Sequence, residues 1–195
     1  MDSSLIIVGD PRQNIYNTHC DSKYDKYSKG NIDDFVLCEC KRQNFDVDKN
    51  SLNLCYRCHK NIVKFLNDFY PEYDQLDYKE IPLNDAQGIF IVRNTDLDIY
   101  LKKYNPIQLR YNKTTKVDEK YRAINYRNSK GSTYDRTIIY PTDALKKYIE
   151  KGIIIDKTST KNAIYVALSR AINSVAIVYD GKISDEISIN IWHNN

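Results

Sequence analysis

One arginine interrupts an apolar segment near the end of the chain, and its chemistry is the most constrained in the sequence. Residues 164–171 read Ile-Tyr-Val-Ala-Leu-Ser-Arg-Ala, so Arg170 is their only charged residue. A cation on a buried helix is unfavourable unless an anion lies opposite it, and a planar guanidinium matches phosphate oxygens well. We therefore expect Arg170 to bind a phosphate group. The alternative is a core helix whose arginine extends to solvent.

Three further segments place polar side chains beside expected strands, two at the end of a strand and one before its start. Residues 8–16 (Val-Gly-Asp-Pro-Arg-Gln-Asn-Ile-Tyr) predict a tight turn that directs Gln13 past the sheet edge, towards a phosphate or an attacking water. Tyr56 and Arg57 close a strand-like run, and Gly131 lies in a polar turn whose backbone N–H groups suit an anion. Taken singly, each segment also fits an ordinary turn, or a buried tyrosine beside a surface arginine.

Together and in this order, the four segments resemble motifs III, IV, V and VI of superfamily 1 helicases of the UvrD/Rep type. The motif V segment, residues 125–135, is partly similar to RecD-like and viral helicases through its Ser-Thr-Tyr at 132–134. Where UvrD-like proteins usually have a histidine and a ribose-binding glutamate, this chain has Arg127 and Thr133. The resemblance implies a RecA-like fold and an ATP-dependent helicase, an ATP hydrolase acting on DNA or RNA.

The resemblance also implies roles for single residues. Gln13, Arg57 and Arg170 are the catalytic candidates, because their counterparts contact the γ-phosphate of ATP, and Tyr56 would stack on the adenine. The implied nucleotide-binding residues are Gly9, Asp10, Gln13, Tyr56, Arg57, Gly131, Thr133 and Arg170. The implied nucleic-acid-binding residues are Arg127, Asn128, Ser129 and Lys130.

Two elements that ATP hydrolysis requires are missing from the sequence. It contains neither a Gly-x-x-x-x-Gly-Lys-Ser/Thr phosphate loop nor an acidic pair for Mg²⁺. In the family both lie upstream of motif III, so we expect the chain to be the C-terminal half of a motor. It would bind ATP and Mg²⁺ only with a complementing N-terminal RecA-like domain or subunit, would bind single-stranded nucleic acid, and would lack ATPase activity alone. The alternative is a catalytically inactive helicase-like module that binds nucleic acid or a helicase partner.

Hydrophobic patterns predict alternating strands and helices. We expect strands at 5–9, 35–40, 52–56, 89–92, 107–111, 136–140 and 174–179, and helices at 59–69, 96–103, 142–151 and 160–172. This alternation predicts an α/β fold, a RecA-like and mainly parallel sheet with helices on both faces, with ligands at the carboxyl ends of the strands. The expected divisions are 1–16, a residual motif III strand of the N-terminal motor domain; 17–34, a loop or insertion; and 35–195, the C-terminal RecA-like helicase domain.

Composition limits the location and the partners. The 195 residues are 42% hydrophobic, but no apolar run approaches a membrane span and the start lacks a secretory signal. We expect a cytoplasmic protein with no membrane partner, compact enough to favour a phage or viral source. Residues 101–151 hold thirteen Lys or Arg against five Asp or Glu, interleaved with Tyr104, Tyr111, Tyr121 and Tyr126. This pattern predicts either a nucleic-acid-binding segment or a solvated, lysine-rich surface.

The five cysteines fit a reducing compartment better than a disulfide framework, because their number is odd. Cys38 and Cys40 form one pair and Cys55 and Cys58 another, a spacing that leaves a tetrahedral zinc site as an alternative. Against zinc, the second pair flanks a strand-to-helix junction, and free cysteines are common in protein cores. We therefore expect no bound metal in this chain.

Overall fold

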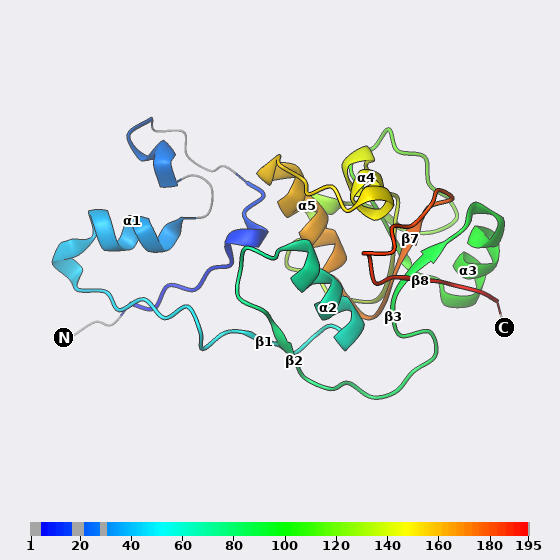
Figure 1. The fold of residues 1–195 in the computed structure, drawn as a ribbon, viewed down its shortest axis with the longest axis horizontal. Helices are drawn as coiled ribbons and strands as arrows, with labels where there is room; N and C mark the ends of the chain where they lie inside the picture. The colour runs from blue at the N-terminus through cyan, green and yellow to red at the C-terminus, as the bar shows by residue number, and fades with distance from the viewer. Residues whose placement is uncertain (1–4, 17–21, 28–30, 195) are drawn as a thin grey trace.

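A parallel sheet of six strands forms the centre of the protein (Figure 1). The computed structural model describes residues 5–16, 22–27 and 31–194. The strand order is β5-β4-β6-β7-β3-β8, and every pair of neighbours is parallel. The strands are β3 (Gly88–Val92), β4 (Ile107–Arg110), β5 (Ala123–Asn125), β6 (Tyr134–Ile139), β7 (Ala171–Val178) and β8 (Asn190–Ile191). The predicted α/β fold with a mainly parallel sheet is confirmed.

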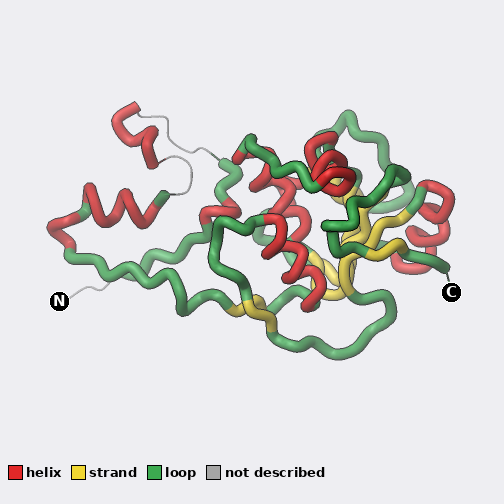
Figure 2. The backbone as a smooth tube through the Cα atoms, viewed as in Figure 1, coloured by secondary structure: helices red, strands yellow, loops and turns green. Residues whose placement is uncertain are grey.

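Helices cover both faces of this sheet (Figure 2). The α-helices are α1 (Ile32–Glu39), α2 (Lys60–Phe69), α3 (Leu97–Tyr104), α4 (Asp143–Lys151) and α5 (Thr158–Leu168). On β7, Val175 and Ile177 pack with α2, α4 and α5, whereas Ala176 and Val178 pack with α3 and Trp192. Alternate side chains of a strand point to opposite faces, so β7 is buried on both sides.

Local sequence explains where the core helices begin and end. In α2, Ile62, Val63, Leu66 and Phe69 share one buried face, and the His59 side chain accepts from the N–H of Asn61 as an N-cap. In α4, the Thr142 hydroxyl oxygen accepts from the N–H of Leu145 at 3.3 Å, and Gly152 ends the helix in the left-handed region with φ 65°. These two helices agree with the predicted ranges because capping and periodicity both favour them.

Two predicted strands are wrong. Leu5, Ile6, Ile7 and Val8 are extended but belong to no sheet, and each is at least half exposed, because no neighbouring strand accepts their backbone hydrogen bonds. Residues 35–40 fall in and just after helix α1, where a short apolar run fits a helix as well as a strand. Of the expected loop at 17–34, residues 17–21 and 28–30 lie outside the described part, and Ser22–Tyr27 form a 3-10 helix, η2.

Other elements differ from the predicted ranges in length, and some were not predicted. The predicted helix 160–172 ends at Leu168, and β7 begins at Ala171. A separate parallel pair, β1 (Leu54–Cys55) and β2 (Asp77–Tyr78), lies beside α2, and β1 is shorter than the predicted strand. Helix α1 and η2 project from the body that contains the sheet (Figure 1). Among the helices of the described ranges, none has the length and apolar content to cross a membrane.

Candidate functional site

The four motif segments meet at the edge of the sheet where β6 and β7 begin. Arg170 directly precedes β7, and its carbonyl oxygen accepts from the N–H of Tyr134, the first residue of β6, at 2.9 Å. The N–H of His59 donates to the carbonyl of Ile172, which brings the Tyr56–Arg57 turn to the same edge. Arg170 and the motif V segment thus lie on connections that enter β7 and β6, at the amino ends of these strands, whereas ligands are expected at the carboxyl ends.

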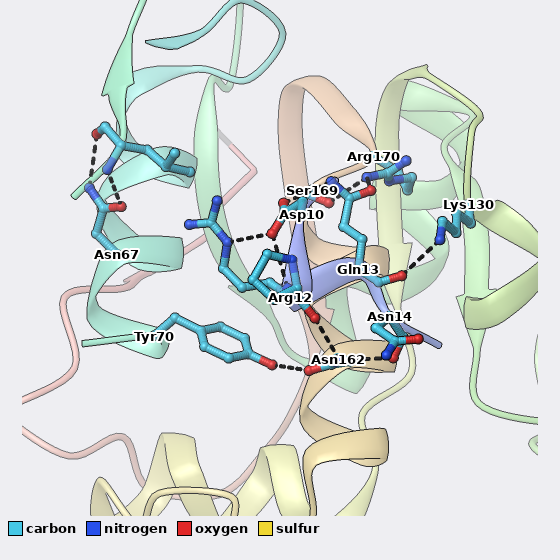
Figure 3. A network of polar contacts seen from close by, with 12 residues as sticks. Asp10, Arg12, Gln13, Asn14, Asn67, Tyr70, Lys130, Asn162, Ser169 and Arg170 are labelled. Atoms are coloured by element: carbon cyan, nitrogen blue, oxygen red, sulfur yellow. Dashed lines mark hydrogen bonds and ion pairs between the residues drawn. The ribbon is translucent and has the colours of Figure 1, made fainter. Parts of the chain in front are cut away.

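Arg170 is buried, with 2% of its surface exposed, and does not extend to solvent. Its Nε donates to the Val166 carbonyl at 2.9 Å, and its Nη2 donates to the hydroxyl oxygen of Ser169 at 2.7 Å and to the side-chain oxygen of Gln13 at 3.2 Å (Figure 3). Burial lowers the pKa of Arg170, and the nearby charge of Arg57 lowers it further. The guanidinium is thus held in a position that disfavours its own charge.

Arg57 lies on the same side of the molecule as Arg170, because both bind Ser169. The half-buried Arg57 donates from Nη1 to the Ser169 carbonyl oxygen at 2.7 Å. In the part of the chain that the structure describes, no ion pair with a carboxylate includes either arginine. Two close guanidinium groups without a paired carboxylate form a place where an anion is favoured.

Gln13 reaches Arg170 because Asp10 holds its other end. The Gln13 amide nitrogen donates to one oxygen of the Asp10 carboxylate at 2.9 Å. The other carboxylate oxygen accepts from the backbone N–H of Arg12 at 3.0 Å and from its Nε at 2.9 Å. The Arg12 guanidinium lies over the rings of Tyr165 and Tyr73, 5.2 and 5.6 Å from their centroids. The structure thus places Asp10 as a residue that orients Gln13.

Asn162 of α5 anchors the same segment from below, and sequence reasoning missed it. Its amide nitrogen donates to the carbonyl oxygens of Asn14 at 2.8 Å and Pro11 at 3.1 Å, and its oxygen accepts from the Tyr70 hydroxyl (Figure 3). An asparagine within an apolar helix is a signal of such a bond, because a buried amide requires partners. Ser169, which joins the two arginines, was also missed although it lies inside the octapeptide around Arg170.

Two cations of the motif V segment bind the backbone of the motif III segment. Lys130 Nζ donates to the Gln13 carbonyl at 2.9 Å, and Arg127 donates from Nη1 to the Ile15 carbonyl. These contacts complete the packing of residues 10–16 against this domain. They also engage two of the four residues expected to bind nucleic acid.

Other residues of the motif V segment differ in exposure. Asn128, Gly131 and Thr133 are exposed, and Gly131 has φ 82° with no atom within 4 Å of the position a Cβ would occupy. Ser129 is buried, and its hydroxyl donates to the Tyr126 carbonyl at 2.6 Å. The exposed turn leaves room for a ligand to approach the backbone closely.

Tyr56 and Gly9 lie at the outer parts of the site. Tyr56 is 68% exposed, and Lys79 Nζ lies 5.7 Å from its ring centroid, which leaves a ring face free for a planar ligand. The alternative of a buried tyrosine beside a surface arginine is wrong, because here the tyrosine is exposed and the arginine half-buried. Gly9 is exposed, with Ile32 of α1 3.9 Å from the position of a Cβ.

The tyrosines of the basic segment 101–151 do not form a stacking surface. Tyr126 is fully buried and donates its hydroxyl to the Tyr140 carbonyl at 2.6 Å. Tyr104, Tyr111 and Tyr121 are half-buried and packed against the core. Tyr126 therefore cannot stack on a base, and the other three rings are partly covered by the core; nucleic-acid binding by this segment stays a prediction.

The zinc alternative is not supported by the positions of the cysteines. Cys38 and Cys40 lie in and after α1, whereas Cys55 and Cys58 lie at the end of β1 and before α2. Over residues 5–16, 22–27 and 31–194, no group of three or more His, Cys, Asp or Glu side chains is placed to hold a metal ion. The two pairs therefore do not combine into one tetrahedral site.

Comparisons with known proteins give likenesses among solved structures alone: no family model and no curated protein matches the chain. Of the 31 matching chains of solved structures, one is the helicase of PRRSV, with 19% identity over 65% of this chain and a TM-score of 0.41. This chain spans 22% of that helicase. Another is the C-terminal domain of a possible DNA helicase from Lactobacillus plantarum WCFS1, with 12% identity over 68% of this chain and 92% of that domain, and a TM-score of 0.42.

Proposed function

We propose that this chain is the C-terminal half of an ATP-dependent superfamily 1 helicase and supplies Arg57 and Arg170 to the γ-phosphate of ATP. The observation that carries the proposal is the pair of guanidinium groups joined through Ser169, one of them buried, neither of which forms an ion pair with a carboxylate of the described residues. A phosphate group would supply the missing anion. The β-phosphate and Mg²⁺ would be held by an N-terminal RecA-like domain or subunit.

The arrangement suits stabilisation of charge during phosphoryl transfer. Negative charge spreads over the oxygens of the transferred group, and preorganised guanidinium groups stabilise it more strongly in a dry site than in water. Arg170 is fixed by Val166, Ser169 and Gln13 before any ligand arrives, so little reorganisation is required. Gln13, held between Asp10 and Arg170, would orient the attacking water.

The outer residues would bind the rest of the nucleotide and the nucleic acid. The exposed ring of Tyr56 would stack on the adenine, which contributes about 1–3 kcal/mol for a base on an aromatic ring. The open backbone at Gly131 and Thr133 would approach the ribose and phosphates. Asn128 and Lys130 would contact a single strand of DNA or RNA, and Arg127 would support the turn that carries them.

The test is to capture the tagged chain from its native source and assay ATP hydrolysis with and without the polypeptide that binds it. We expect negligible turnover by the chain alone, and turnover with a partner that contains a phosphate loop. In that complex, Arg57→Ala and Arg170→Ala should each lower kcat by about a thousandfold, as for arginine fingers. Arg42→Ala, which removes an exposed arginine after α1, is the matched control and should leave kcat unchanged. Robust Arg170-dependent ATP hydrolysis by the chain alone would disprove the proposal that a second domain must hold the β-phosphate and Mg²⁺.

A second candidate is a catalytically inactive module that binds nucleic acid or a helicase partner. It is favoured by internal bonds that form without a ligand: Arg127 and Lys130 join the motif III segment to the motif V segment, and Arg170 bonds to Gln13. Capture of a partner without a phosphate loop, together with salt-dependent single-strand binding that ATP does not change, would support this candidate over the first.

A further inference from the structure

Cys55 and Cys58 form a thiol pair on either side of Arg57. Cys55 ends β1, and Cys58 lies one residue before His59, the N-cap of α2. The backbone N–H of Cys58 donates to the Cys55 sulfur over 3.5 Å. Cys55 is partly exposed, whereas Cys58 is 1% exposed, with its sulfur 3.6 Å from the carbonyl oxygen of Ser169. The turn therefore leaves one cysteine partly exposed and buries the other.

The surroundings make the two thiols chemically different. The hydrogen bond from the Cys58 thiol lowers the pKa of Cys55 to about 5 against the opposing effect of burial, and backbone N–H groups and the Arg57 charge lower it further. The same hydrogen bond and burial raise the pKa of Cys58. The lowered pKa of Cys55 and the raised pKa of Cys58 favour the thiolate at the partly exposed Cys55 over the buried Cys58, which is the division of roles in a redox-active Cys-x-x-Cys turn.

We propose that Cys55 and Cys58 are an oxidation site for hydroperoxides and convert between a dithiol and a disulfide. The Cys55 thiolate attacks one peroxide oxygen; the S–O bond forms, the O–O bond breaks, and the leaving oxygen takes a proton to become water or an alcohol. Cys58 then loses its proton, and its sulfur attacks the Cys55 sulfenic acid. The S–S bond forms, the S–O bond breaks, and hydroxide leaves with that proton as water. The two thiols lose two electrons in total, and the peroxide gains them.

The disulfide would act on the arginine that lies between the two cysteines. The carbonyl oxygen of Ser169 is the acceptor for Arg57 Nη1 at 2.7 Å and lies within reach of the Cys58 thiol at 3.6 Å. Oxidation removes the thiol proton, so the contact of Cys58 with the Ser169 carbonyl is lost and that carbonyl is left to Arg57 alone. The oxidation state of the pair is thereby linked to the acceptor that holds Arg57, independently of which anion the arginines bind.

The test uses the full-length chain with Cys20, Cys38 and Cys40 replaced by Ser, so that only the pair remains. After hydrogen peroxide treatment we expect a mass lower by two hydrogens and a peptide map that links Cys55 to Cys58. Cys58→Ser should leave a sulfenic acid at Cys55 that dimedone captures, and Cys55→Ser should abolish this capture. Alkylation of Cys55 should change less than twofold between about pH 6.5 and 8, whereas an ordinary thiol with a pKa of about 8.5 slows nearly tenfold per unit.

Two outcomes would overturn the proposal. One is a peroxide-treated pair that carries over-oxidised sulfur, or remains free, without any linkage between the two cysteines. The other is an alkylation rate for Cys55 that falls with pH as an ordinary thiol does. Peptide mapping of the wild-type chain decides the first point even where Cys58→Ser fails to fold, with exposed Cys38 as the internal comparison. Neither measurement requires ATP, a partner or nucleic acid, so failure here is distinct from failure of the proposed function.

Discussion

Arg170 donates from Nη2 to the side-chain oxygen of Gln13, 157 positions away in the chain, at 3.2 Å. The contact joins a residue that enters the central strand to one in the first described segment. Because Asp10 holds the amide nitrogen of the same glutamine, both ends of Gln13 are fixed. This bond therefore connects the first segment of the chain to the candidate site. Variants of the residues around it test how much they contribute to stability.

Replacing Asp10 should release both Arg12 and Gln13. Asp10→Ala removes the acceptor for three N–H donors, so we expect the free energy of unfolding to fall by about 1–3 kcal/mol. Asp10→Asn keeps one acceptor oxygen and should lose less. Urea denaturation of both variants measures this. Equal stability of Asp10→Ala and the wild type would show that the carboxylate does not hold the segment.

Arg170 should be expendable for stability although it is buried. Its lowered pKa means that folding disfavours the charged form, so at neutral pH the charge reduces stability, and an apolar side chain of similar length avoids this. We expect Arg170→Met to change the free energy of unfolding by less than about 1 kcal/mol.

Arg136→Met is the matched comparison for Arg170→Met. Arg136 is also buried, but it donates to the carbonyls of Asp85 and Ala86, which would lose this partner, so its loss should cost about 1–3 kcal/mol. Its ion pair with Asp135 at 3.6 Å adds little, because Asp135 is 65% exposed. Denaturant midpoints of the two variants compare them. Similar large losses would show that Arg170 has a mainly structural role.

Asn162→Ala should detach residues 11–14 from α5. The change removes two bonds to the carbonyls of Pro11 and Asn14 and one from Tyr70, so protease cleavage within residues 5–16 should become faster. Asn67→Ala is the control, because Asn67 also makes two backbone bonds but to Leu76. Mass spectrometry of the first fragments distinguishes them, and early N-terminal cleavage in both would contradict the prediction.

Stability should decrease as the pH falls through the range just below 6.5. Burial lowers the pKa of His59, so the folded protein binds this proton less readily than the unfolded chain. The stability that neutral His59 contributes is fully present above the unfolded pKa and is lost as the pH falls towards the folded pKa. Protonation also removes the Nδ1 acceptor that caps α2.

His59→Asn tests this assignment because asparagine caps a helix without titrating in this range. Unfolding free energies from urea titrations at about pH 7 and 5.5 should differ for the wild type and much less for the variant. The same pH dependence in both proteins would assign the effect to other groups.

The core of the fold is predictable from the sequence where two signals coincide. Helices α2 and α4 have periodic apolar residues and capping side chains, and β3 and β6 have short β-branched runs. Helix α3 has the expected Asp96 at its N-cap, but the Asp96 side chain makes no cap bond. The run at residues 5–8 is equally β-branched, yet whether it pairs depends on a neighbour that local sequence does not specify. Strands β5 and β8 were missed because they are short and their burial depends on the sheet already formed.

The sequence predicts which residues lie in the candidate site but not the hydrogen bonds that hold them there. Arg57, Arg170 and Gln13 lie together as their residue types and order suggested, although their roles remain predictions. The hydrogen bonds that hold them in place come from Ser169, Asn162 and Asp10. These bonds depend on side-chain and backbone torsion angles, which residue spacing in the sequence does not specify. The exposure of the tyrosines in residues 101–151 also depends on tertiary packing, because their rings pack towards the core.

Strand β7 starts one residue after Arg170 and is paired on both flanks, with β6 and β3. Because β7 is hydrogen-bonded on both sides, the backbone of Arg170 is held in place and its side chain can move little. Under the proposed function, Arg57 and Arg170 would stay fixed in this domain while the opposing N-terminal domain rotates towards them. Step size along the nucleic acid would then be set by how far that other body rotates.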